Sequence, residues 1–301
     1  MYDLVAATEA HLVRPRFPTN SVCHLYPTEA SVKLANGAVL GACLRAGYLR
    51  CKEEPGLPHT AYSQQIFKLG KANEDMIIDT WKEMGIFETR AVRFVNAEYN
   101  LSGELDCILK NPETGKWFGA EVKTFYGYQA GVGIFGNKGH VGAPKIAHLL
   151  QTLIYAYEFK HKLPYFELFY MERGNGDKGS FRVEVVQDSQ TKDLYWPKIN
   201  GVIKKEFSIN DIYKRYATLS DYIISSTMPD KEFEFRYNNE KIEQLFHDGS
   251  LSQSKYDAWK KVAKKTGAVT YNEYNRPGDW NCSYCMHRGF CWPEHAAYIK
   301  A

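Results

Sequence analysis

Two short apolar runs, residues 104–110 and 117–124, constrain the fold more than any other part of the chain. Each run has the composition of a β-strand, and the turn sequence NPETG separates them. A hairpin with a loop at 112–115 places Asp106 opposite Glu121. Directly opposed side chains lie about 4.5–5.5 Å apart, and like charges there are destabilising. A bound divalent cation is the natural way to offset this repulsion.

Lys123 follows Glu121 by two residues, and this spacing places both side chains on one face of the strand. Ala120 and Val122 then turn toward the core. Oxygen ligands from Asp106 and Glu121 suit Mg²⁺ or Mn²⁺, and Lys123 is placed to orient or deprotonate an attacking water. This chemistry is that of phosphodiester hydrolysis. The alternative is an exposed sheet face on which Lys123 simply pairs with Glu121.

The remaining periodic segments predict a mixed β-sheet covered by helices. A glycine-rich stretch over 127–142 is expected to be a loop that follows the second acidic strand, with Lys138 and His140 placed to reach a phosphate. The further helices are expected at 62–84, 145–160, 210–225 and 252–265, and the further strands at 91–97, 165–171 and 181–187.

The composition is that of a globular protein in which any basic surface is confined to part of the molecule. The 301 residues are 44% hydrophobic, enough for a substantial core, and the formal charge of +3 excludes a uniformly cationic chain. No segment has the pattern of a signal peptide or a membrane span, so we expect a soluble cytoplasmic protein without a membrane partner. We therefore expect no disulfides among the seven cysteines.

Three cysteines near the C-terminus, Cys282, Cys285 and Cys291, have the spacing C-x2-C-x5-C, which is typical of a metal or cluster site. A tetrahedral or cluster site needs a fourth ligand. Zinc and an iron–sulfur cluster both fit this spacing. The candidates for the fourth ligand are Cys43, Cys51, Cys23, His287 and His295.

The acids and the lysine resemble the signature of the PD-(D/E)XK nuclease superfamily. "GELD" matches its first half, with Leu105 in place of the proline, and "EVK" at 121–123 matches its second. Glu74, four residues after Gly70, resembles the helix acid of lambda-type exonucleases. The pair Gln151 and Tyr155 resembles the Gln-x-x-x-Tyr motif of RecB-like members, and "CLRAGY", which begins at Cys43, resembles the N-terminal cluster ligand of iron–sulfur RecB-like exonucleases.

The resemblance implies a restriction-endonuclease-like α/β core over about 60–190, within a single nuclease domain of residues 1–301. A cysteine-rich region formed by about 20–58 and 200–301 joins the two ends of the chain. The implied metal ligands for Mg²⁺ or Mn²⁺ are Glu74, Asp106, Glu121 and Val122. The implied catalytic set adds Lys123, Gln151 and Tyr155, and the implied ligands of a structural [4Fe–4S] cluster are Cys43, Cys282, Cys285 and Cys291, with zinc as the alternative.

The implied function is a DNA exonuclease that acts on ends or single strands. The alternative is a catalytically silent subunit that binds or processes nucleic acid. A role in phage recombination or DNA repair, a role in CRISPR adaptation with a protein partner, and a homo-oligomer are all compatible with the resemblance.

Two further patterns carry less weight. "GVGIFG" at 131–136 matches a dinucleotide-binding glycine motif, but the expected loop there argues against one. The lysines of "WKKVAKK" at 259–265 indicate either a nucleic-acid surface or a solvated helix. Stacking faces for single-stranded bases are expected from Trp259, Tyr126, Tyr128 and Tyr155.

Overall fold

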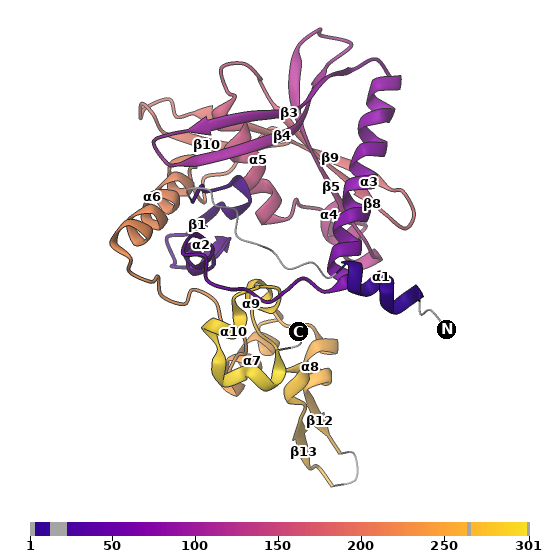
Figure 1. Cartoon of the computed structure of the whole chain (residues 1–301), viewed down its shortest axis with the longest axis vertical. Helices are drawn as coiled ribbons and strands as arrows, with labels where there is room; N and C mark the ends of the chain where they lie inside the picture. Colours follow the sequence, from indigo (N-terminus) through magenta and orange to yellow (C-terminus); the bar gives the residue numbers. More distant parts are fainter. Residues whose placement is uncertain (1–3, 13–22, 264–265, 300–301) are drawn as a thin grey trace.

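A computed structural model describes residues 4–12, 23–263 and 266–299 (Figure 1). Its centre is a seven-stranded sheet with the order β11-β10-β9-β8-β5-β4-β3. The strands are β3 (Phe87–Asn96), β4 (Leu101–Lys110), β5 (Trp117–Phe125), β8 (Phe166–Glu172), β9 (Lys178–Gln187), β10 (Tyr195–Ile199) and β11 (Val202–Ile203).

The sheet is mixed because its central strands β5 and β8 run parallel, whereas its other neighbouring pairs are antiparallel. A parallel pair needs a crossover connection, and here the chain crosses through helices. The connection contains α4 (Tyr128–Phe135), the short hairpin β6 (Gly136–Asn137) and β7 (His140–Val141), and α5 (Ile146–Glu158). The crossover therefore carries α5 back across the sheet, directly beside the strand that bears Glu121 and Lys123.

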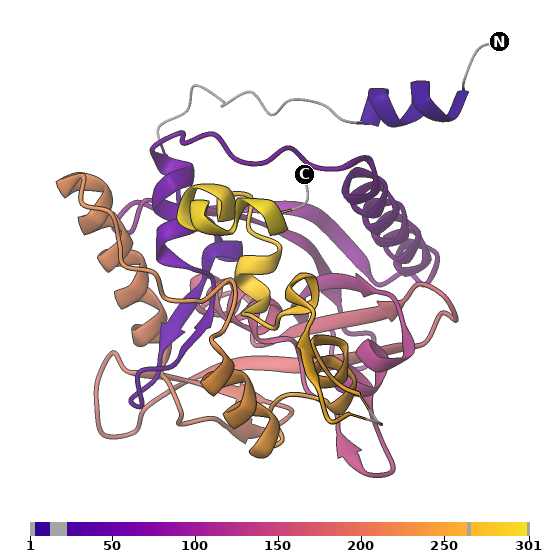
Figure 2. The same ribbon diagram turned by 90° about the horizontal axis from the view of Figure 1, so that it is seen from below.

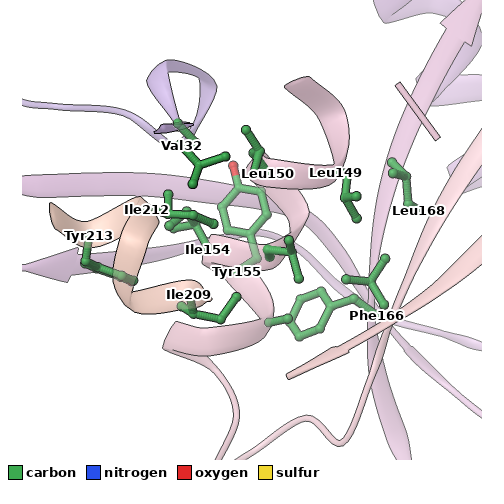
Figure 3. Close-up of a cluster of buried hydrophobic side chains, with 14 of the residues drawn as sticks. Val32, Leu149, Leu150, Ile154, Tyr155, Phe166, Leu168, Ile209, Ile212 and Tyr213 are labelled. Atoms are coloured by element: carbon green, nitrogen blue, oxygen red, sulfur yellow. The ribbon is translucent and has the colours of Figure 1, made fainter. Parts of the chain in front are cut away.

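Helices cover both faces of the sheet. On one face, α3 (Ala61–Glu83) packs Ile77, Ile78 and Trp81 against side chains of β4 and β5. On the other, α5 and α6 (Ile209–Ser225) form the larger core, and Figure 3 shows side chains of α5, α6 and β8 meeting there. Ser208 caps α6 by accepting from the Asp211 amide, which fixes where this helix begins.

Residues 41–57 lie beside the C-terminal elements, next to this core (Figures 1 and 2). The Asn281 side chain donates from Nδ2 to the Gly41 carbonyl at 2.9 Å, and the Leu57 backbone amide donates to the Met286 carbonyl at 2.8 Å. The N-terminal elements are α1 (Leu4–Leu12), η1 (Pro27–Glu29), β1 (Ser31–Lys33), β2 (Val39–Gly41) and α2 (Leu44–Cys51). The C-terminal elements are α7 (Asn239–His247), α8 (Gln253–Trp259), β12 (Lys260–Val262), β13 (Val269–Tyr271), η2 (Glu273–Asn275), α9 (Trp280–Ser283), α10 (Arg288–Cys291) and η3 (Pro293–Tyr298).

The predicted α/β architecture is confirmed, and the predicted helices at 62–84, 145–160 and 210–225 match α3, α5 and α6. Two local predictions are wrong. The expected loop over 127–142 contains α4 and a hairpin, because Phe135 packs on Phe125 and holds the segment against the core. The expected helix over 252–265 ends at Trp259, since Lys260–Val262 pairs with β13 instead.

Candidate active site and cysteine pocket

The hairpin of β4 and β5 brings Asp106 and Glu121 together. Its ladder runs from Lys110↔Trp117 to Cys107↔Ala120, which is the predicted register. At the next step, Asp106 Oδ2 accepts a hydrogen bond from the Val122 amide at 2.7 Å. The register therefore brings the two acids to the same end of this ladder.

Glu121 lies at the centre of a buried polar cluster. Its Oε1 accepts from Lys123 Nζ at 2.6 Å and from Gln151 Nε2 at 2.7 Å. Its Oε2 is buried and has no hydrogen-bond partner among the residues that the structure describes. Glu121 is 1% exposed, and a partnerless carboxylate oxygen at such a position is costly unless a ligand binds it.

The electrostatics of the cluster follow from this burial. Burial raises the pKa of Asp106 well above the usual carboxyl range, and the charge of Glu121 raises it further. Burial also raises the pKa of Glu121, which Lys123 partly opposes. Burial alone would lower the pKa of Lys123, but the Glu121 and Asp106 carboxylates outweigh it and the pKa is raised. A bound divalent cation, in addition to Lys123, would favour the ionised form of both acids.

Gln151 and Tyr155 support this cluster from α5. Gln151 Nε2 also contacts the Tyr155 hydroxyl at 3.3 Å, and that hydroxyl donates to the Glu104 carbonyl at 3.0 Å. Both side chains are buried, with exposures of 7% and 3%. Tyr155 is therefore not available for stacking on bases, which corrects one sequence expectation, and its position is that of a brace between α5 and β4.

Glu74 of α3 lies near the two acids but is engaged by cations. Its Oε1 accepts from Lys71 Nζ at 2.6 Å and from Arg90 at 3.2 Å. The charge of Glu74 contributes to raising the pKa of Asp106, so the two carboxyl groups interact electrostatically. Lys71 and Arg90 had not been expected at the site, since nothing in their local sequence marks them.

The four cysteines of the predicted cluster line one pocket. Cys43, the residue before α2, meets Cys282, Cys285 and Cys291 there, together with Arg45 and Trp292. Burial raises the pKa of Cys43 to about 11 and that of Cys282 to about 12, and neighbouring thiols add to both shifts. The pocket is thus built from segments far apart in the sequence.

Two cysteines behave differently from the prediction. Cys23 and Cys51 form a disulfide, so the expectation of unpaired thiols is wrong for them. Spacing within the sequence does not report this contact, which depends on how α2 packs against the segment before η1. His287, one of the candidates for the fourth ligand, is 3% exposed and, like Cys23, Cys51 and His295, is not among the lining residues of the pocket.

Within the described ranges, no three or more His, Cys, Asp or Glu side chains are arranged as a group that could hold a metal ion. The carboxylate site therefore offers two close acids, and the pocket offers four thiols that surround a shared space. Mg²⁺ is commonly held by one or two carboxylates together with water and substrate phosphate, so two acids fit its chemistry.

The side chains expected to contact nucleic acid differ in their exposure. Tyr126 and Tyr128, just after β5, are 72% and 76% exposed, whereas Trp259 is fully buried. Lys260 pairs with Glu243 at 2.7 Å, and Lys264 and Lys265 lie outside the described residues. Gly131 and Gly133 of the glycine motif lie within α4 rather than between a strand and a helix.

Comparisons with known proteins add little to this geometry. No family model and no curated protein matches the chain. A solved structure named SSO0001 is 14% identical, and the alignment covers 96% of this chain and 93% of that one with a TM-score of 0.39. A likeness at this level carries no conclusion about function. Among the described helices, none has both the length and the apolar character to cross a membrane.

Proposed function

We propose that this protein is a metal-dependent deoxyribonuclease, an exonuclease that acts on DNA ends or single strands. The observation that carries the proposal is the partnerless, buried Oε2 of Glu121 beside Asp106 and Lys123. Burying two carboxyl groups together is unfavourable for folding alone, so their retention in this arrangement is best explained by a ligand.

Asp106 and Glu121 would hold Mg²⁺ or Mn²⁺, with Glu74 and the Val122 backbone as the further ligands that the family resemblance implies. Such an ion, when bound, supplies Lewis-acid polarisation of a phosphate. The partnerless Oε2 and the raised pKa of both acids support this assignment.

We assign to Lys123 the role of orienting or deprotonating the attacking water. Its ammonium donates to Glu121 Oε1 at 2.6 Å, which holds it in place. Because 22% of the side chain stays exposed, Lys123 can still contact a substrate. Gln151 Nε2 donates to the same oxygen at 2.7 Å and helps to hold the carboxylate in place. The exposed Tyr126 and Tyr128 at the end of β5 support a single-stranded substrate, because aromatic faces stack on unpaired bases.

We further propose that Cys43, Cys282, Cys285 and Cys291 bind a structural [4Fe–4S] cluster, with zinc as the alternative. The four cysteines that line one pocket support this proposal, and the family resemblance favours iron. Such a site would tie α2 to the C-terminal elements beside the catalytic core.

The test is cleavage of end-labelled DNA with Mn²⁺ by the wild type, Asp106→Ala and Lys123→Ala. We expect cleavage by the wild type and a loss of at least about a hundredfold in each variant. His161→Ala, which changes an exposed residue in the turn after α5, is the control and should cleave normally. Equal cleavage by all four proteins would contradict the assignment. DNA binding without any cleavage would favour the silent subunit.

A further inference from the structure

His148 is a polar residue of the candidate active site that the sequence motifs do not mark. On α5 it precedes Gln151 by three residues and Tyr155 by seven, a spacing that places all three on one helical face. It is partly exposed, and the nearby charge of Lys123 acts on its ring. His148 therefore lies where the catalytic lysine meets α5.

A hydrogen-bonded chain fixes which nitrogen of His148 carries the proton. Tyr170, the neighbour of Lys123 across the β5–β8 ladder, is fully buried, and its hydroxyl accepts from the Lys145 amide at 3.1 Å. The hydrogen of that hydroxyl needs an acceptor. Among the described residues the one within reach is His148 Nδ1, at 3.0 Å. Nδ1 is therefore the acceptor, and Nε2 carries the hydrogen.

The second nitrogen, Nε2, is left to donate outward. No hydrogen bond to it occurs within the described part of the chain, and it is not among the buried partnerless atoms, so it reaches solvent. Burial, followed by the charges of Lys123 and Lys145, lowers the pKa of His148 to about 3. The ring therefore stays neutral at working pH, with one N–H aimed away from Tyr170.

We propose that His148 is a catalytic hydrogen-bond donor whose Nε2–H binds a non-bridging oxygen of the scissile phosphate. The assignment rests on the proposed nuclease function and adds a residue to it. A neutral donor beside the Lys123 ammonium gives the phosphate two donors of different kinds, one charged and one uncharged. Donors held in place before the reaction stabilise charge that grows in the transition state. His148 cannot serve as the general base through Nε2, because that nitrogen already holds its proton.

The first test compares single-turnover cleavage by the wild type, His148→Leu and His148→Gln with Mn²⁺. We expect His148→Leu to lower the cleavage rate about a hundredfold. Glutamine offers an oxygen to Tyr170 and an N–H outward, so His148→Gln should recover a large part of the rate. The ratio of wild-type to His148→Leu rates should stay constant from about pH 6 to 9, because the ring does not titrate there.

Control measurements separate catalysis from folding. His161→Leu changes an exposed histidine in the turn after α5 and should cleave like the wild type. DNA affinity and thermal unfolding of His148→Gln should also match the wild type. Tyr170→Phe removes the group that fixes the tautomer and should lower the rate severalfold without changing affinity.

The outcomes distinguish the two proposals. If the wild type cleaves DNA and His148→Leu cleaves equally fast, the role of His148 is overturned while the nuclease stands. The role of His148 is also overturned if the ratio of wild-type to His148→Leu cleavage rates changes with pH as a titrating histidine would. If the wild type cleaves no DNA under any metal condition, both proposals fall.

Discussion

Asp106 and Glu121 oppose folding unless something compensates their charges. Burial raises the pKa of both acids, the charge of Glu121 raises that of Asp106 further, and the charge of Glu74 adds to the shift of Glu121. The folded protein therefore favours a protonated carboxyl at a pH where the unfolded chain is ionised. A raised carboxyl pKa contributes stability that is present below the ordinary value of about 3.9 and lost as the pH rises through the folded-state pKa. Without metal, this contribution therefore decreases as the pH rises above that ordinary value.

Asp106→Asn should stabilise the metal-free protein at neutral pH. The amide cannot ionise, and its oxygen can still accept from the Val122 amide. In EDTA at pH 7 we expect the unfolding midpoint to rise by a few degrees, since about 1 kcal/mol corresponds to roughly 2–4 °C in domains of 150–250 residues. The difference from the wild type should shrink as the pH falls toward 4. A variant less stable than the wild type at pH 7 would count against a repulsive pair.

At the same scale, the sequence predicted the residues that lie close together in the chain. Asp106, Glu121 and Lys123 belong to one hairpin, so the alternation of strand side chains is enough to place them. His148 could have been found from its helical spacing to Gln151. Arg90 could not, because its contact with Glu74 depends on how α3 lies across β3.

Among the elements, β5 is closely packed against its neighbour β8. Gly119 lies beside Phe166 of β8, and a Cβ at Gly119 would be 2.2 Å from the Phe166 ring. Phe166 is fully buried, so its ring has little room to move. A glycine at this position lets the two central strands pack closely, two residues before Glu121.

Gly119→Ala should destabilise the fold by about 1–3 kcal/mol, the usual cost of overpacking a core. Chemical denaturation gives this value directly. Gly133→Ala is the matched control, because a Cβ there meets nothing within 4 Å and Gly133 lies within α4. Alanine should stabilise that helix by up to about 1 kcal/mol. A neutral Gly119→Ala would show that β5 and β8 can shift apart.

Element prediction succeeded where periodicity was strong and failed where distant contacts decide. The helix α3 and the strands β4 and β5 follow their own patterns of apolar residues. The helix α4 contains two glycines and has weak intrinsic preference for helix, so packing against β5 and β9 decides its structure. Likewise β12 follows a helical pattern in sequence but pairs with β13.

Across the whole molecule, the cysteine pocket joins the start of α2 to the C-terminal elements. Nothing local in the sequence around Cys43 shows that it meets Cys282, so this contact came from family resemblance and not from physical reasoning. A ligand held by all four thiols would close a long loop, which restricts the unfolded chain and stabilises the C-terminal elements.

Cys282→Ser should therefore lose bound iron and sulfide, together with the visible absorption of the anaerobically purified protein. Protease cleavage should then begin in the C-terminal elements while α3 and the sheet remain protected. Cys51→Ser removes the disulfide and should keep the iron. If the wild type contains zinc and no iron, zinc is the bound group in place of the cluster, and it would still link α2 to the C-terminal elements. If Cys282→Ser keeps its metal and its pattern of protease cleavage, the four cysteines do not hold a group that links α2 to the C-terminal elements.

Direct Mn²⁺ binding tests the central claim, that the buried acids form a divalent-metal site. The spectrum of free Mn²⁺, measured by electron paramagnetic resonance, gives the bound fraction for the wild type, Glu121→Gln and the exposed control Glu113→Gln. We predict one tight Mn²⁺ per chain in the wild type and in Glu113→Gln, and an affinity at least tenfold weaker in Glu121→Gln, about 1.4 kcal/mol. Equal binding by Glu121→Gln and the wild type would contradict the account.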